Sequence, residues 1–289
     1  MNQVTEASTE KFIQLPKWRI RYHDAGQGAP VILLHGSGPG ASAWSNFSQN
    51  IEALAKKYRV IALDFPGWGQ SDEFNPETGK RFAVNAEVVI GLMDGLGIER
   101  AAVVGNSMGG IASQMVTALH PGRVTHCVTM GAPAPGGPQP FYQPSGLTEG
   151  LKILFEAYRT PTEDNVRRLV EIMVYDSSFA SDALIRQRTE NALANKNHLT
   201  NFLKGLATMH IDAVGQDDMV HALEKSSVPA LIMHGRDDRV VPVEHSLRTA
   251  ALMPNASLLV FNRCGHWAQL EHAAKFNALL DGFLSGTTA

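Results

Sequence analysis

The chain has 289 residues, of which 44% are hydrophobic and 18% are charged, and its formal net charge is −3. This size is sufficient for a large buried core, and the charge gives no reason to expect nucleic acid or a membrane surface as a partner. No apolar run could span a bilayer and the polar N-terminal stretch is not typical of a signal peptide, so we expect a cytoplasmic protein. Cys127 and Cys264 form no disulfide or zinc pattern, and we expect no metal and no cofactor.

Strand and helix patterns alternate along the first half of the chain. A β-hairpin is predicted at residues 12–15 and 19–23. Further strands are predicted at 31–34, 59–63, 101–104 and 124–130, and helices at about 46–56, 83–96 and 110–119. This alternation predicts an α/β fold with a mostly parallel, doubly wound sheet that carries helices on both faces.

After Gly131 the alternation stops. Residues 132–144 contain five prolines, and from residue 148 to about 210 the apolar spacing is helical. Thr160 is predicted as the N-cap of one of these helices, with Pro161 in the first helical position and Glu163 completing a capping box. We predict a core formed by residues 1–133 and 212–289 and an inserted helical lid at 134–211. The substrate cleft is expected between lid and core; the alternative is an insertion without function.

A glycine-flanked serine stands between the predicted strand 101–104 and the helix 110–119, in the sequence Gly105-Asn106-Ser107-Met108-Gly109. A serine at such a sharp turn is held in strained backbone geometry with its hydroxyl exposed, and the glycines avoid clashes. The helix N-terminus favours negative charge developing beside the hydroxyl. This context predicts that Ser107 is a nucleophile and makes a chance match improbable.

A serine needs a base and a group that orients this base. The fold that carries this turn places the acid and then the histidine after later strands. Predicted strands at 229–233 and 257–261 lead into Asp237-Asp238 and into His266, respectively. His266 is the one histidine that lies late, after a strand and next to a glycine. Asp237 and Asp238 both suit the role of the acid, and their position alone does not separate them.

The glycine-rich segment Gly36–Ala41 fits two interpretations. It matches the dinucleotide pattern GxGxxG/A, and Asp64 ends the next strand at a suitable distance, so a nicotinamide-dependent oxidoreductase is one alternative. Pro39 argues against it by removing an N–H from the loop that would hold pyrophosphate. A cofactor site would also leave the serine, the acid and the histidine unexplained. We therefore assign the loop to an oxyanion hole formed by the backbone N–H groups of Ser37 and Met108.

One arginine lies on the apolar side of a predicted lid helix at 182–195. Arg188 has Leu184 and Ala192 four residues before and after it, so its side chain should face the core. A buried arginine without a partner is costly. Its partner could be the anion of a ligand, or an internal carboxylate, or the side chain could extend to water. The residues alone leave these interpretations open.

Six motifs can be compared with those of known families: HGSGPGA at 35–41, WSNF at 44–47, GNSMGG at 105–110, MVYD at 173–176, GRDDRVVP at 235–242 and CGHWAQLEH at 264–272. In these motifs the chain resembles the α/β-hydrolase family from about residue 12 to its C-terminus. Within that family it resembles the meta-cleavage product hydrolases, which break carbon–carbon bonds in ring-opened aromatic compounds. The resemblance implies an α/β-hydrolase fold with a helical lid.

The resemblance also implies roles for individual residues. It favours Asp238 as the acid and Arg188 as the group that holds the substrate's carboxylate. Other positions implied near the substrate are Gly38, Asn46, Asn106 and Trp267. Ser37 stands where many relatives carry glycine, and its hydroxyl could alter the oxyanion loop.

The implied substrate is a 2-hydroxy-6-oxo-2,4-dienoate, a small molecule that is split into 2-hydroxypenta-2,4-dienoate and a carboxylic acid. The resemblance also predicts a homodimer or larger homo-oligomer. A carboxylesterase of the same fold and a non-catalytic ligand sensor are the alternatives. Dehalogenases and epoxide hydrolases of this fold use aspartate at the elbow, so Ser107 argues against both.

Overall fold

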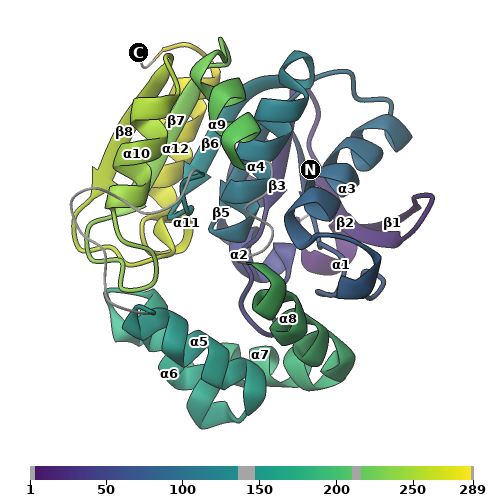
Figure 1. Ribbon diagram of the computed structural model, residues 1–289, viewed down its shortest axis with the longest axis vertical. Helices are drawn as coiled ribbons and strands as arrows, with labels where there is room; N and C mark the ends of the chain where they lie inside the picture. Colours follow the sequence, from purple (N-terminus) through teal and green to yellow (C-terminus); the bar gives the residue numbers. More distant parts are fainter. Residues whose placement is uncertain (1–3, 136–146, 210–215, 288–289) are drawn as a thin grey trace.

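The computed structural model describes residues 4–135, 147–209 and 216–287, and it contains one eight-stranded sheet (Figure 1). The strands lie side by side in the order β1-β2-β4-β3-β5-β6-β7-β8. Pairing is parallel from β4 to β8, whereas β1 and β2 form an antiparallel hairpin that adds to β4. Their bounds are β1 Glu10–Gln14, β2 Arg19–Ala25, β3 Pro30–Leu34, β4 Arg59–Leu63, β5 Ala101–Asn106, β6 Val124–Met130, β7 Ala230–Gly235 and β8 Ala256–Phe261.

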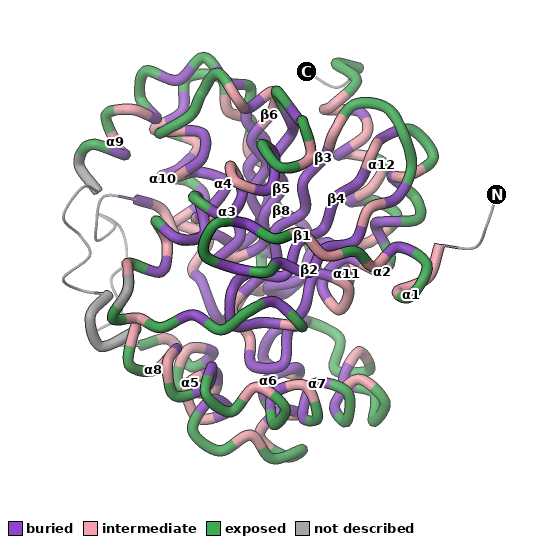
Figure 2. Tube along the Cα trace, turned by 90° about the vertical axis from the view of Figure 1, so that its right-hand side faces the viewer, coloured by how far each residue is buried: buried purple, intermediate pink, exposed green. Residues whose placement is uncertain are grey.

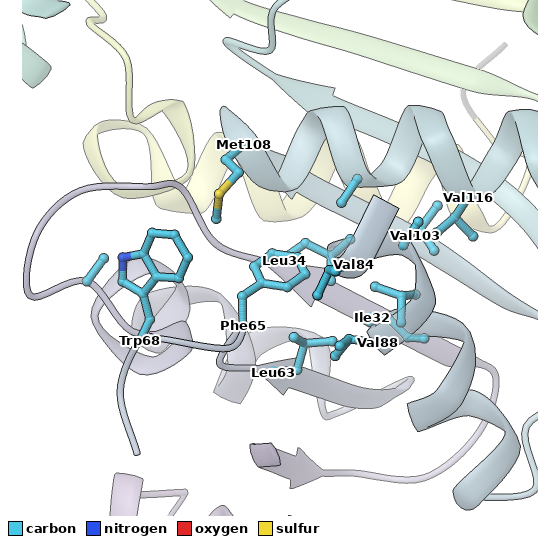
Figure 3. Packing of buried hydrophobic residues seen from close by; sticks show 14 of the residues in the cluster. Ile32, Leu34, Leu63, Phe65, Trp68, Val84, Val88, Val103, Met108 and Val116 are labelled. Carbon is cyan, nitrogen blue, oxygen red and sulfur yellow. The ribbon is translucent and has the colours of Figure 1, made fainter. Parts of the chain in front are cut away.

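Helices cover both faces of this sheet. One face packs against α3 (Arg81–Gly95) and α4 (Met108–Leu119), and Figure 3 shows Val84, Val88 and Val116 of these helices against strand residues. The other face packs against α2 (Ala43–Leu54) and α12 (Ala273–Leu284). The remaining core helices are α1 Glu6–Thr9, α9 Gln216–Glu224, α10 Glu244–Leu252 and α11 Ala268–Glu271.

Burial on both faces explains the composition of the inner strands. All of β5 and β7 is buried, which is why these strands are continuous apolar runs rather than alternating ones. The buried residues trace the middle of the molecule in Figure 2. The predicted doubly wound α/β sheet is therefore confirmed.

In the described residues 147–209, which follow β6 in the chain, there are four α-helices: α5 Glu149–Arg159, α6 Glu163–Met173, α7 Asp182–Ala194 and α8 Lys196–Met209. They contact one another and lie together beyond one end of the sheet (Figure 1). The predicted boundary at residue 211 and most of the proline-rich segment lie outside the described residues, because they fall within 210–215 and 136–146, respectively. Among the residues that are described, no helix is long and apolar enough to cross a membrane.

Two predicted helix starts are wrong. The N-cap of α6 is Thr162, whose side chain accepts a hydrogen bond from Asn165 N. Thr160 instead ends α5, because its N–H still bonds to Glu156 O. Helix α2 begins three residues earlier than predicted, because Ser42 and Ser45 form a reciprocal capping box.

Candidate active site

The turn after β5 is the sharp serine turn that its glycines predict. Ser107 has φ 53° and ψ −115°, one of two non-glycine residues with positive φ in the described part of the chain. A Cβ at Gly105 would lie 2.0 Å from Gly109 O, and one at Gly109 would lie 2.0 Å from Leu34 O. Such a backbone is retained only where the surrounding structure holds it, and it is typical of functional sites. Helix geometry also leaves Met108 N–H without a partner inside α4.

Asp238 and His266 form a hydrogen-bonded pair. The Nδ1–H of His266 donates to Asp238 Oδ2 at 2.7 Å, so the other ring nitrogen of a neutral imidazole is left as an acceptor. Asp238 Oδ1 accepts from the backbone N–H groups of Val240 and Val241, and His234 Nε2 lies 3.3 Å from Oδ2. The carboxylate is therefore fixed on all sides.

Electrostatics around this carboxylate favour its charged form. Burial opposes ionisation, since the side chain of Asp238 is only 1% exposed. The positive potential of His266 and the hydrogen bonds from His234 and His266 outweigh burial and hold the pKa of Asp238 below its usual range. The neighbouring Asp237 is 30% exposed, lies 3.4 Å from Arg236, and makes no contact of this kind with the imidazole. The structure thus brings Asp238 rather than Asp237 to His266.

The histidine loop and the serine turn meet at the end of the sheet. Asn106 Nδ2 donates both to Met130 O and to His266 O at 3.1 Å. A Cβ at Gly131 would lie 2.9 Å from His266 Nδ1, so this glycine (φ 54°) leaves the space that the imidazole fills. Asn106 Oδ1 is buried without a hydrogen-bond partner. Asn106 therefore connects the serine turn to the histidine loop and retains one free acceptor.

The loop after β3 runs beside the serine turn, since a Cβ at Gly36 would lie 3.4 Å from Ser107 Cβ. His35 determines how this loop is oriented. Phe65 N donates to His35 Nε2 at 3.0 Å, so Nδ1 carries the proton and donates to Gly36 O at 2.7 Å. Burial lowers the pKa of His35 and keeps it neutral. Because a trans peptide points its C=O and N–H in opposite directions, the N–H of Ser37 faces away from His35.

The same loop is held by its carbonyl groups and by one amide side chain. The Tyr158 hydroxyl of α5 donates to Ser37 O, and the Trp68 indole N–H donates to Gly38 O at 3.1 Å. Asn46 Oδ1 accepts from Gly36 N at 3.4 Å, while its amide donates to Ser42 O. Asn46 is thus engaged with the loop.

Arg188 projects from α7 into the same region. It is 1% exposed, and its Nε and Nη1 have no hydrogen-bond partner in the described residues. The guanidinium lies 4.7 Å from the centre of the Trp267 ring, and Nη1 would be 3.2 Å from a Cβ at Gly38. Burial lowers the pKa of Arg188 to about 10, opposed only by Tyr158. A charged side chain at neutral pH therefore lies next to the loop with unused donors.

The dinucleotide alternative does not fit this geometry. Asp64, its candidate ribose ligand, is fully buried. Its Oδ1 accepts from Ala43 N at 2.6 Å and its Oδ2 accepts from Arg21 Nη1 at 3.2 Å. The carboxylate is thus committed to the core. In the described part of the chain, no group of three or more His, Cys, Asp or Glu side chains could hold a metal ion.

Sequence reasoning missed two residues that contact this region. Tyr158 was not singled out, because an aromatic residue on the apolar face of a helix is usually a core residue. Glu271 falls inside a quoted motif but received no role, because a carboxylate at a helix end is usually solvated. Its two oxygens accept from Gly265 N and Tyr175 N, which are separated by 90 residues. No local pattern could have revealed either contact.

Comparison with known proteins identifies the family. The model of the alpha/beta hydrolase fold family matches residues 29–273, so the chain belongs to the α/β-hydrolases. A 2-hydroxy-6-oxononadienedioate/2-hydroxy-6-oxononatrienedioate hydrolase of Paraburkholderia xenovorans is 44% identical over 291 residues, covering 99% of this chain and 98% of that protein. A protein of the same name from Paraburkholderia phymatum is 45% identical over 97% of each chain.

Solved structures agree with these relatives. The structure of a meta-cleavage product hydrolase from Pseudomonas fluorescens is 34% identical, with a TM-score of 0.82 over 98% of this chain and 100% of that one. The 2-hydroxy-6-oxo-6-phenylhexa-2,4-dienoate hydrolase of a Rhodococcus strain is 28% identical, with a TM-score of 0.81 over 96% and 98%. Within the α/β-hydrolases, the chain is a meta-cleavage product hydrolase, an enzyme that hydrolyses carbon–carbon bonds.

Proposed function

We propose that the chain hydrolyses the bond between C5 and C6 of a 2-hydroxy-6-oxo-2,4-dienoate and releases 2-hydroxypenta-2,4-dienoate and a carboxylic acid. The observation that carries this proposal is the buried guanidinium of Arg188, whose Nε and Nη1 have no hydrogen-bond partner in the described residues and which lies next to Gly38 in the loop after β3. A buried cation without a counter-charge is costly, and the carboxylate of the dienoate supplies that charge. Trp267 and Gly38 lie next to the guanidinium, so a carboxylate bound there would meet an aromatic ring and the loop after β3.

Ser107, Asp238 and His266 form the catalytic group in this proposal. His266 takes the proton of the Ser107 hydroxyl, and Asp238 stabilises the imidazolium that results. The 2.7 Å hydrogen bond from His266 Nδ1 to Asp238 supports this assignment, because it leaves Nε2 as the proton acceptor. The backbone N–H groups of Ser37 and Met108 stabilise the oxyanion, in agreement with the orientation of the Gly36–Ser37 peptide.

Breaking a carbon–carbon bond requires a leaving carbon that tolerates negative charge. The enol of the dienoate therefore first becomes its keto form, so that the departing fragment is a stabilised dienolate. Ser107 then adds to the C6 ketone, the C5–C6 bond breaks, and the acyl group remains on the serine. The dienolate takes the proton that His266 holds, and the neutral imidazole then activates the water that releases the acid. Asn106 is placed near the dienoate by this proposal, and its unpaired Oδ1 supports a polar contact there. Asn46 is assigned to the same end of the pocket.

The group on C6 is proposed from the relatives. Those that are 44% and 45% identical are named for nonadienedioate and nonatrienedioate, which carry a second carboxylate at the far end of the chain. Hydrolysis of the nonadienedioate between C5 and C6 would give succinate as the acid. We therefore propose that C6 of the substrate carries an alkyl chain ending in a carboxylate rather than an aryl group.

The organisation of the protein completes the proposal. Residues 134–211 act as a lid over a core made of 1–133 and 212–289, and the substrate binds between them; α7, which carries Arg188, supports this division. We further propose a cytoplasmic homodimer or larger homo-oligomer. Size-exclusion chromatography with light scattering measures the oligomeric state, and a monomer at micromolar concentration would contradict it.

The test is a spectrophotometric assay on a panel of yellow ring-fission products that differ at C6. The wild type should remove visible absorbance over many turnovers, fastest with the nonadienedioate, and Ser107→Ala should abolish the reaction. Turnover of simple aryl esters without loss of dienoate colour would instead indicate a carboxylesterase. Binding of the dienoate without multiple turnover would indicate a ligand sensor.

A further inference from the structure

A single carboxylate joins the histidine loop to the lid. Glu271, the last residue of α11, accepts a hydrogen bond from Gly265 N at Oε1 (2.7 Å) and from Tyr175 N at Oε2 (2.6 Å). Gly265 directly precedes His266, whereas Tyr175 lies in the connection between α6 and α7 of the lid. Each oxygen therefore holds a different segment.

The two segments also contact each other directly. His266 N donates to Met173 O at 2.6 Å. A Cβ at Gly265 would lie 2.5 Å from Met173 O and 2.8 Å from Val174 Cα, so the two backbones are packed as closely as glycine allows. Glu271 therefore reinforces a backbone contact that fixes where His266 sits relative to the lid.

Charge and burial show why a carboxylate is suited to this place. Burial raises the pKa of Glu271, while N–H groups of Tyr175, Gly265 and Asp176 favour its ionised form. A carboxylate offers two acceptor oxygens and no donor, which matches backbone N–H groups arriving from two sides. An amide in its place would present one NH2 group to a donor.

From this geometry we propose that Glu271 is a positioning residue that couples lid docking to the orientation of the His266 imidazole. The inference rests on the proposed role of His266 as the base. Glu271 touches neither the serine turn nor Arg188 in the described contacts, so it acts through the backbone of 265–266. With this link intact, the lid connection and the histidine loop move as one unit. Without it, His266 loses part of the support that keeps Nδ1–H on Asp238.

The experiment compares Glu271→Gln with Glu52→Gln, a matched change at an exposed glutamate of α2. Glu271→Gln should lower kcat roughly 10- to 100-fold for both the dienoate and a neutral aryl ester, because displacement of the base affects both reactions. KM for the ester should stay within about threefold, since the ester-binding contacts are untouched. Glu271→Asp keeps the charge but has a shorter reach, and it should fall between the wild type and Glu271→Gln.

A second measurement separates positioning from a merely structural role. The His266 Nδ1 proton, bonded to Asp238, should give a low-field NMR resonance in the wild type and in Glu52→Gln. This resonance should broaden or disappear in Glu271→Gln at a temperature where circular dichroism shows a folded protein. Wild-type kcat and an unchanged resonance in folded Glu271→Gln would overturn the proposal, even if its Tm were lower. The resonance is measured without substrate, so it tests the position of His266 alone. If the proposed serine-dependent reaction is wrong, Ser107→Ala would still turn over the dienoate, which is a separate result.

Discussion

Replacing Arg188 with methionine should make the protein more stable and the enzyme much less active. Burial lowers the pKa of the guanidinium from its usual value to about 10. This difference corresponds to a cost of about 3 kcal/mol to the folded state. Folding disfavours the charged form of this cation. The cost is therefore constant below about pH 10 and is lost only as the pH rises above 10, towards the pKa of the guanidinium in the unfolded chain. Methionine fills similar space without a charge, so stability at pH 7 should rise by about 1–3 kcal/mol.

Thermal unfolding and kinetics measure the two effects. For a chain of 289 residues, Tm should rise by roughly 2 to 5 °C. The value of kcat/KM for the dienoate should fall about 30-fold or more, since loss of one partner of a buried charge pair costs about 2–5 kcal/mol. Hydrolysis of a neutral aryl ester should stay within about threefold. Arg186→Met is the control, because Arg186 lies exposed on the same helix and should change none of these values by much.

Two results would refute this reasoning. If Arg188→Met were less stable than the wild type, the guanidinium would have a stabilising partner and would not depend on a ligand. If dienoate and ester activities fell equally, Arg188 would support the shape of the site rather than bind a carboxylate.

Three further perturbations test other parts of the site. Asp238→Asn should lower kcat roughly 10⁴-fold in steady-state assays, because nothing then holds the imidazole in the required tautomer. In Asp237→Asn, kcat should stay within about threefold of the wild type. Equal losses in the two variants would contradict Asp238 as the acid that orients His266. Tyr158→Phe removes the hydrogen bond to Ser37 O. It should lower the free energy of unfolding by about 1 kcal/mol and lower kcat severalfold. An unchanged kcat would argue against a role of Tyr158 in positioning the loop after β3. His198 of α8 is buried beside Trp68, with 4.1 Å between the ring centroids, and burial lowers its pKa to about 3. Between pH 6.5 and 3 the unfolded chain therefore binds a proton that the folded protein does not. When the pH falls from 7 to 5, the free energy of unfolding, measured with urea, should therefore fall by about 2 kcal/mol less in His198→Phe than in the wild type. An equal fall in both proteins would show that the ring is not held neutral.

Features that depend on neighbouring residues were predictable from the sequence. The strands β4 and β6 begin and end at the predicted residues, because β4 is mostly apolar, β6 is rich in β-branched residues, and both are followed by turn signals. The serine turn followed from two glycines within five residues. Helix starts were less predictable: Thr160 and Thr162 both suit an N-cap, and which one serves depends on where α5 ends.

Features that depend on distant contacts were not predictable from local patterns. Asp237 and Asp238 are equivalent in sequence, and only the approach of a histidine 28 residues away distinguishes them. The family resemblance favoured Asp238, but the residues alone did not. The link made by Glu271 spans 96 residues, and the contact from Tyr158 to the loop after β3 spans 121. Such contacts are set by how helices and loops that are distant in the sequence pack together.

Product analysis with 2-hydroxy-6-oxonona-2,4-dienedioate as substrate shows whether Ser107 directs hydrolysis of the C5–C6 bond. Chromatography and NMR should find 2-hydroxypenta-2,4-dienoate and succinate in equal amounts, one of each for every dienoate consumed, and neither product with Ser107→Ala. Loss of colour without equimolar fragments, or the same fragments from the alanine variant, would contradict serine-dependent carbon–carbon bond hydrolysis by this chain.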